Sequence, residues 1–347
     1  MKLHIVSLPH TQTVREPSSC AYTQKVRRFA DMMDSLGHEC LVYAGEESDA
    51  AGELVTVVGK AEQVGMSEEF DPNLPHWQNM NKRTIRAISR RYSGEGNELL
   101  CLIAGRCQQQ IAASLPEIPA VEFGIGYSGT FADFRVFESY AWMHMVYGQD
   151  YTAHGADGRF YDTVIPNSYD LEEFPYSDKD DGYLLYMGRL IDRKGLAVIG
   201  EIAKNTDRKV LVAGGGDKLL VPKGCKYLGV LGPKERAEVM GKAAALIAPT
   251  LYIEPFGGVT VEAMLCGTPV ITTDWGGFTE TITPGITGFR CRRLSEFINA
   301  TKLVDQLDRK EIRSWAKRFT TDVVKYDYDK YLQDVVDLKK GRGWYSL

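Results

Sequence analysis

Two glycine-flanked segments in the second half of the chain carry charged side chains at spacings that suit phosphate chemistry. The first, residues 188–195 (GRLIDRKG), follows an apolar run and places Arg189 and Lys194 five residues apart. Arginine offers a planar fork of donors and lysine a compact charge, and both bind phosphate oxygens. The segment predicts a phosphate-binding turn between a strand and a helix. Two cations at this spacing are equally common on a solvated surface.

The second segment holds two carboxylates eight residues apart, Glu254 in a predicted loop and Glu262 in the helix that follows. Pro255 keeps Glu254 out of the helix, because proline does not fit a helix interior. Gly257 and Gly258 let a ligand approach bare amides at the positive end of that helix. We expect both carboxylates to face one opening that can hold a phosphate, a sugar and a ribose.

Apolar runs that alternate with helical patterns surround both segments. A helix from about Ser18 to Leu36 is expected after the first strand, with Ser18 or Ser19 as its N-cap and Gly37 at its end. Strand, helix, strand order is typical of an α/β fold with doubly wound parallel sheets. The expected strands cover residues 3–6, 39–43, 99–103, 120–124, 163–167, 183–187, 209–213, 243–247 and 269–272.

A polar stretch at residues 172–182 divides the chain into two expected domains, 1–170 and 171–325. The length of 347 residues supports this division, because a domain usually has roughly 100–200 residues. Residues 59–81 are expected to be a loop-rich insertion before a helix over 81–91. From residue 294 onwards the pattern is helical without a strand.

The composition argues against several classes of protein. The net charge is −5, and residues 1–170 hold 14 Lys and Arg against 22 Asp and Glu, whereas the remainder holds 27 against 24. A basic-shifted second half suits a phosphate-bearing ligand, and an acidic first half argues against broad nucleic-acid binding. The sequence has no run of eighteen apolar residues, so it predicts no membrane span. Seven scattered cysteines without a C-x-x-C pair predict reduced thiols in the cytoplasm and no structural metal.

Taken together in their order, these motifs resemble those of the family-4 retaining glycosyltransferases of the GT-B fold. The Glu-x7-Glu pattern of that family matches Glu254 to Glu262, and its Gly-Arg-Leu-x-x-x-Lys-Gly pattern matches residues 188–195. The resemblance covers about residues 163–290 and also includes residues 165–167, 213–216, 267–270 and 276–277.

The resemblance implies two Rossmann-like doubly wound domains facing across a cleft, with the second binding a nucleotide sugar. It also implies a C-terminal helix, about residues 326–347, that crosses back onto the first, acceptor-side domain. Arg189 and Lys194 would neutralise the diphosphate and Glu262 would bind the ribose hydroxyls. Glu254 would hold the transferred hexose. The remaining donor-side candidates are Gly188 and the amides of Gly257, Gly258 and Val259. The family uses no metal and retains the anomeric configuration.

The first half departs from the family pattern. Its first loop, residues 9–13, has no glycine, and Gly124 stands where the family often has a donor-contacting histidine. Several polar residues are candidates to replace that histidine on the acceptor side. Their alternative role, as buried polar groups that support a helix, is equally consistent with the sequence. They are His10, Glu122, Tyr127, Arg135, Glu138 and His144.

We therefore expect a metal-independent hexosyltransferase without a cofactor, with a UDP-glucose-like donor favoured and a hydroxyl-bearing acceptor of unknown class, in glycan or glycoconjugate synthesis. Alternatives are glycosylation of a modified nucleic-acid base, a nucleotide-sugar phosphorylase or epimerase, and a non-catalytic sugar-nucleotide binding module. A peripheral contact with a membrane or nucleic acid is conceivable but not favoured. It would use the cations Lys82, Arg83, Arg86, Arg90 and Arg91.

Overall fold

The computed structural model describes residues 1–15, 20–65, 70–154 and 158–341, and these form two compact units. Unit 1 contains Met1–Glu138, Met145–Ser168 and the chain from Thr321 onwards, and unit 2 contains Ser139–His144 and Tyr169–Thr320. The sequence placed the two borders slightly later, at residues 170 and 325. Tyr169 groups with unit 2, where its amide donates to the carbonyl of Phe319 at 2.9 Å and where it pairs with Thr320 in an isolated parallel bridge.

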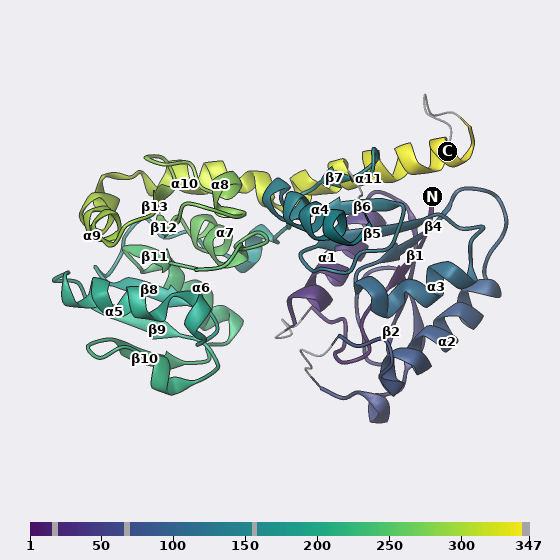
Figure 1. Ribbon diagram of the computed structural model, residues 1–347, viewed down its shortest axis with the longest axis horizontal. Coiled ribbons are helices and arrows are strands. Elements are labelled where there is room, and N and C mark those ends of the chain that lie inside the picture. Colours follow the sequence, from purple (N-terminus) through teal and green to yellow (C-terminus); the bar gives the residue numbers. More distant parts are fainter. Residues whose placement is uncertain (16–19, 66–69, 155–157, 342–347) are drawn as a thin grey trace. The chain divides into compact units, whose positions relative to one another are not determined.

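Unit 1 is built on a seven-stranded parallel sheet in the order β3-β2-β1-β4-β5-β6-β7 (Figure 1). Its strands are β1 (Lys2–Val6), β2 (Glu39–Gly45), β3 (Glu53–Val58), β4 (Glu98–Leu102), β5 (Ala120–Ile125), β6 (Phe134–Phe137) and β7 (Thr163–Val164). The helices that belong wholly to it are α1 (Ala21–Ser35), α2 (Pro75–Ser89), α3 (Gln109–Ser114) and α11 (Thr321–Lys339), while α4 (Tyr140–His154) begins within the residues of unit 2.

The last described helix, α11, belongs to the core of unit 1. Its buried residues Tyr328 and Leu332 share an apolar cluster with Phe29 of α1 and with Phe123 of β5. The Phe29 ring stacks on Phe123 with centroids 4.2 Å apart and meets Tyr328 edge-on at 5.1 Å. The helical pattern after residue 294 thus ends in a segment that buries an apolar stripe on α1 and the sheet.

Unit 2 is built on a six-stranded parallel sheet in the order β10-β9-β8-β11-β12-β13. Its strands are β8 (Leu184–Met187), β9 (Val210–Ala213), β10 (Lys226–Gly229), β11 (Ala245–Ala248), β12 (Val270–Thr273) and β13 (Gly288–Cys291). Its helices are α5 (Leu196–Lys204), α6 (Pro233–Gly241), α7 (Gly258–Leu265), α8 (Phe278–Thr281), α9 (Leu294–Leu303) and α10 (Arg309–Ala316). Each unit is thus a doubly wound α/β sheet, as the sequence predicted.

Short 3₁₀ segments lie between these elements. They are Lys60–Glu62, Gly105–Gln108, Leu171–Glu173, Asp192–Lys194, Lys218–Leu220, Val304–Gln306 and Lys317–Phe319. Among the described helices, none is long and apolar enough to cross a membrane.

The sequence misjudged two helix boundaries. Helix α2 begins at Pro75, inside the expected loop-rich insertion, because proline is well suited to the first position of a helix. Helix α1 begins at Ala21 after Cys20, and the expected caps Ser18 and Ser19 lie outside the described residues.

Candidate functional site

The charged segments of unit 2 come together where the strand order of its sheet reverses. Strands β8 and β11 are neighbours and parallel, although β9 and β10 lie between them in the chain. The segment with Arg189 and Lys194 follows β8, and the loop with Glu254 follows β11. Ligands of doubly wound sheets bind outside the carboxyl ends of the strands at such a switch point. The site therefore lies where the fold leaves room for a ligand.

Lys194 and Glu254 form an ion pair across this switch point. Lys194 Nζ donates to Glu254 Oε2 at 2.5 Å, and the two side chains are 17% and 14% exposed. The ammonium also lies 5.0 Å from the ring centroid of Tyr252. Burial and the nearby Glu254 carboxylate raise the pKa of the Tyr252 phenol, so this hydroxyl stays protonated at neutral pH. The pair is therefore largely shielded from water.

A glycine at position 195 allows the Lys194 turn to approach the β11 loop. Gly195 has φ +79°, a left-handed conformation, and a Cβ atom there would lie 2.0 Å from the carbonyl oxygen of Pro249. The amide of Leu251 donates to the carbonyl of Arg193 at 2.9 Å. Only glycine fits this close backbone contact, which fixes Lys194 beside Glu254.

The N-terminus of α7 closes the other side of the Glu254 loop. Its N-cap, Gly257, has φ +85°, and a Cβ atom there would lie 2.3 Å from the Phe278 ring. The Glu254 carbonyl accepts from the amide of Gly277 at 2.8 Å. Helix geometry directs the first-turn amides of α7, including those of Gly258 and Val259, out of the helix end. That end is a favourable place for an anion.

Glu262 has a cationic partner that the sequence did not suggest. Its carboxylate Oε2 accepts from Nη2 of Arg236, which comes from α6. The Arg236 side chain is 40% exposed and that of Glu262 is 17% exposed. Each of the two carboxylates is therefore bound to a cation from another element.

The remaining cation, Arg189, is exposed on the turn after β8. The turn is held by its backbone, because the Arg189 carbonyl accepts from the Tyr186 hydroxyl at 2.7 Å. The amide of Gly188 donates to the carbonyl of Ala213 at 3.0 Å. The guanidinium thus extends from an anchored turn.

In unit 1, three of the acceptor-side candidates belong to the interior. Glu122 is fully buried and accepts from the hydroxyl of Tyr127 at 3.2 Å, and from the amides of Phe131 and Ala132 at 2.7 and 2.8 Å. Burial raises the pKa of the Glu122 carboxyl. Arg135 is 3% exposed and forms two hydrogen bonds to Asp162 at 3.0 and 2.6 Å. These contacts join each charged group to residues outside the helices, the loop amides of Phe131 and Ala132 or the carboxylate of Asp162, and not to a helix as the alternative role assumed.

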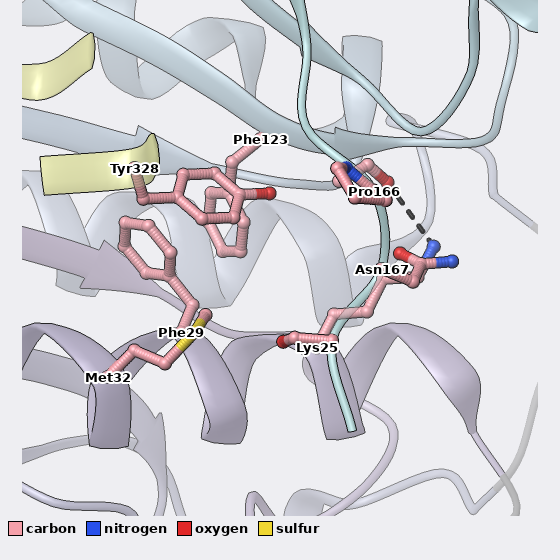
Figure 2. Close-up of a pocket in the computed structure, with 9 residues that line it drawn as sticks. Lys25, Phe29, Met32, Phe123, Pro166, Asn167 and Tyr328 are labelled. Atoms are coloured by element: carbon pink, nitrogen blue, oxygen red, sulfur yellow. Dashed lines mark hydrogen bonds between the residues drawn. The ribbon is translucent and has the colours of Figure 1, made fainter. Parts of the chain in front are cut away.

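Glu138 lies in a small polar cluster at the carboxyl edge of the unit 1 sheet. It accepts from Lys25 of α1 and, at 2.9 Å, from the side-chain amide Nδ2 of Asn167, and Lys25 also donates to the Gly124 carbonyl at 3.3 Å. Figure 2 shows Lys25 and Asn167 on one side of a pocket and the rings of Phe29, Phe123 and Tyr328 on the other. The cavity volume of about 20 Å³ suits a water molecule and not a sugar.

The two histidine candidates lie in different surroundings. His10, after β1, is buried, and its Nε2 lies 3.3 Å from Sγ of Cys20. His144 is exposed on α4 and lies in the part of that helix that groups with unit 2. Nothing in the structure tests whether either histidine contacts the sugar acceptor, so both roles stay predictions.

The cationic helix α2 presents its charges outward. Lys82, Arg83, Arg86 and Arg90 are exposed, and Arg83 forms a bidentate pair with Glu62 at 2.5 and 2.7 Å. Arg91 is partly buried and bonds to Glu53 at 3.4 Å.

Within the described residues, no group of three or more His, Cys, Asp or Glu side chains is arranged to hold a metal ion.

Residues 170–310, nearly the whole of unit 2, match the model of the family Glycosyl transferases group 1. Unit 2 is a glycosyl transferases group 1 domain. The matched range contains Arg189, Lys194, Glu254 and Glu262, so the charged cluster at the switch point belongs to this domain. The part of the chain before residue 170 lies outside the match.

One known protein is similar to this chain in sequence, and two solved structures are similar to it in fold. The uncharacterized glycosyltransferase MJ1178 of Methanocaldococcus jannaschii is 27% identical over 151 residues, which cover 41% of this chain and 43% of that protein. AviGT4, a glycosyltransferase involved in avilamycin A biosynthesis, has a similar structure, with a TM-score of 0.71, 17% identity and coverage of 96% and 98% of the two chains. Anabaena Alr3699/HepE in complex with UDP and glucose gives a TM-score of 0.69 at 16% identity, with coverage of 96% and 99%. The chain has the GT-B fold of these glycosyltransferases, and the matched segment spans less than half of the curated relative.

The sequence analysis missed Tyr252, Arg236 and Lys25. Tyr252 lies two residues before Glu254, so its place within the Glu-x7-Glu segment could have indicated it. No local sequence pattern indicates Arg236 or Lys25 as site residues, because their partners Glu262 and Glu138 are 26 and 113 residues away.

Proposed function

We propose that this protein is a retaining, metal-independent glycosyltransferase that moves a hexose from a nucleotide diphosphate sugar to an acceptor hydroxyl. The observation that carries the proposal is the charge arrangement at the switch point of the group 1 domain. There, Lys194 is paired with Glu254 beside the N-terminus of α7, and Arg189 lies on the turn after β8. Two cations and a helix N-terminus at one switch point suit a diphosphate.

The two carboxylates bind different parts of the donor. Glu254 and the first-turn amides of Gly258 and Val259 bind the hexose hydroxyls, and Glu262 binds the ribose. In the structure Glu254 is paired with Lys194. On donor binding, the diphosphate oxygens take up part of the Lys194 charge, and Glu254 becomes an acceptor for sugar hydroxyls. The pairing keeps both charges compensated before the donor enters, which lowers the cost of burying them.

The chemistry needs stabilisation of the leaving group more than a strong base. The bond between the anomeric carbon and the β-phosphate oxygen breaks, and negative charge builds on that phosphate. Arg189, Lys194 and the positive end of α7 stabilise this charge, a role that a divalent ion fills elsewhere. The acceptor oxygen attacks the same face of the sugar, and its proton passes to the departing phosphate. The configuration at the anomeric carbon is then retained.

A UDP-glucose-like donor is the first choice for a test. The structurally similar Alr3699/HepE was solved in complex with UDP and glucose. The acceptor is a hydroxyl compound.

The test is a panel of UDP, GDP and ADP sugars, screened first by thermal shift and then for turnover. A donor at roughly 100 times its dissociation constant adds about 2.7 kcal/mol of stability. Turnover is followed as nucleoside diphosphate release with and without simple acceptors, and the anomeric configuration of the product is read by NMR. Inversion would contradict the proposed mechanism. Release of sugar 1-phosphate, or donor binding without turnover over any acceptor panel, would support a phosphorylase or a binding module instead.

A further inference from the structure

The partner of Glu262 in helix α6 has a role that the group 1 motifs do not assign. We propose that Arg236 is a positioning residue that holds the Glu262 carboxylate toward the ribose of the donor and so makes the site select ribonucleotides over deoxyribonucleotides. This inference rests on the proposed function, which gives the ribose to Glu262.

The ion pair is not needed to dock α6 on α7. Ala237 and Met240 of α6 share an apolar cluster with Val261 and Met264 of α7. The Met240 carbonyl also accepts from the Thr268 hydroxyl at 2.7 Å. Because Arg236 is 40% exposed, its pair with Glu262 adds little to stability compared with these buried contacts. The pair therefore serves mainly to orient the two side chains.

The place of Arg236 in its helix supports the same conclusion. Helix α6 begins at Pro233, so Arg236 is the fourth residue and lies near the positive end of the helix dipole. A cation is unfavourable there, whereas a carboxylate is favourable. Glu235 meets that preference, since its carboxylate accepts from the amide of Gly232 at 3.2 Å. The compensation for Arg236 comes from Glu262, on a different helix.

The pair leaves one oxygen of Glu262 available to a ligand. Arg236 Nη2 contacts Oε2, and within the described part of the chain no further partner of the Glu262 carboxylate is found. Oε1 can then accept from a ribose hydroxyl while Oε2 stays fixed. Without Arg236, the carboxylate would rotate and the ribose bond would lose its fixed geometry.

The experiment measures ribose selectivity by isothermal titration. UDP, GDP and ADP are tested on the wild type, and the one that binds is compared with its 2′-deoxy and 3′-deoxy forms. A hydrogen bond to a charged group corresponds to a selectivity of roughly tenfold or more for the ribose form. Arg236→Ala should weaken binding of the ribose form until the selectivity is about threefold or less, with the deoxy affinities unchanged. Arg236→Lys should give an intermediate ratio.

Two further variants separate positioning from general charge. Lys234→Ala removes an exposed cation from the same helical turn and should leave the ratio at the wild-type value. Glu262→Gln should lower the ratio as Arg236→Ala does, and the double variant should show no additional loss, because both substitutions remove one interaction. Melting temperatures verify that each variant is folded. If Arg236→Ala is unfolded, the ribose selectivity of Arg236→Lys tests the proposal instead.

Three outcomes would overturn the inference. Equal weakening of ribose and deoxyribose forms by Arg236→Ala would mean that Arg236 supports the phosphates or the fold. A wild type that binds the diphosphate without ribose selectivity would contradict the role of Glu262 while leaving glycosyl transfer intact. Failure of all three nucleoside diphosphates to bind would instead reject the proposed function itself.

Discussion

Lys194 Nζ lies 2.5 Å from Glu254 Oε2, so the cation and the carboxylate proposed to contact the diphosphate and the hexose are direct partners before any donor is bound. The two residues come from loops after neighbouring parallel strands, β8 and β11. Because each residue neutralises the other, the loss of one leaves the other as an uncompensated charge in a largely shielded place. Single substitutions should therefore be more harmful than the loss of one ligand contact alone.

The cations give the first prediction. Lys194→Ala and Arg189→Ala should each reduce the rate of sugar transfer by roughly a hundredfold or more, since each removes a preorganised charge that stabilises the leaving phosphate. Initial rates at saturating donor measure the effect. Lys204→Ala, which removes an exposed cation on the neighbouring helix α5, is the matched control. Near-normal turnover in both site variants would refute the assignment.

A second prediction concerns metal dependence. If Arg189, Lys194 and the N-terminus of α7 supply the positive charge, activity should be unchanged after dialysis against EDTA, to within about twofold, because the leaving-group charge is already stabilised. The measurement is turnover of the active donor with EDTA and then with added manganese or magnesium. Loss of activity with EDTA and its return with manganese would contradict the mechanism.

The sequence predicts an element or a motif where its residues lie close together in the chain, and it does not predict contacts between distant residues. The α/β order and the motif residues were predictable, because each motif occupies a contiguous segment next to an apolar run. The pairs Lys194 with Glu254 and Arg236 with Glu262 join residues 60 and 26 positions apart. Their contact follows from the strand order and from helix packing, which no local spacing reveals.

The errors in helix boundaries have a similar cause. The sequence pattern predicts a loop at Pro75 because proline often breaks helices, whereas at the first position of α2 its missing amide costs nothing. In unit 1, Glu122 and Arg135 are candidates because they lie in the run of residues 121–144, which contains Gly124 at the position of the family's histidine. Their partners, the amides of Phe131 and Ala132 and the carboxylate of Asp162, could be identified only in three dimensions.

The third prediction tests the packing of the last helix in unit 1. Leu332 is fully buried in the cluster that contains Phe29 and Tyr328. Leu332→Ala should lower the free energy of unfolding by about 2–5 kcal/mol, because it leaves a cavity in a close-packed core. Urea titration measures the loss. Lys330→Ala, an exposed position of the same helix paired with Asp334, should change stability by less than about 1 kcal/mol. Equal effects of the two substitutions would contradict this packing.

The fourth prediction uses the buried carboxyl of Glu122, whose pKa is raised by burial above its ordinary value of 4.5. Below pH 4.5 the Glu122 carboxyl is neutral in both the folded and the unfolded chain. As the pH rises above 4.5, this carboxyl ionises first in the unfolded chain, so the free energy of unfolding falls until the pH exceeds the folded-state pKa. Glu122→Gln keeps an oxygen for the amides of Phe131 and Ala132 but cannot titrate. The variant should therefore lose less stability than the wild type between pH 4 and pH 7 in urea titrations, by about 1.4 kcal/mol for each unit of pKa shift. Glu117→Gln, at an exposed position of the same unit, should follow the wild-type curve. A Glu122→Gln curve that runs parallel to the wild type, or that falls more steeply, would show that the carboxyl is not held in its neutral form.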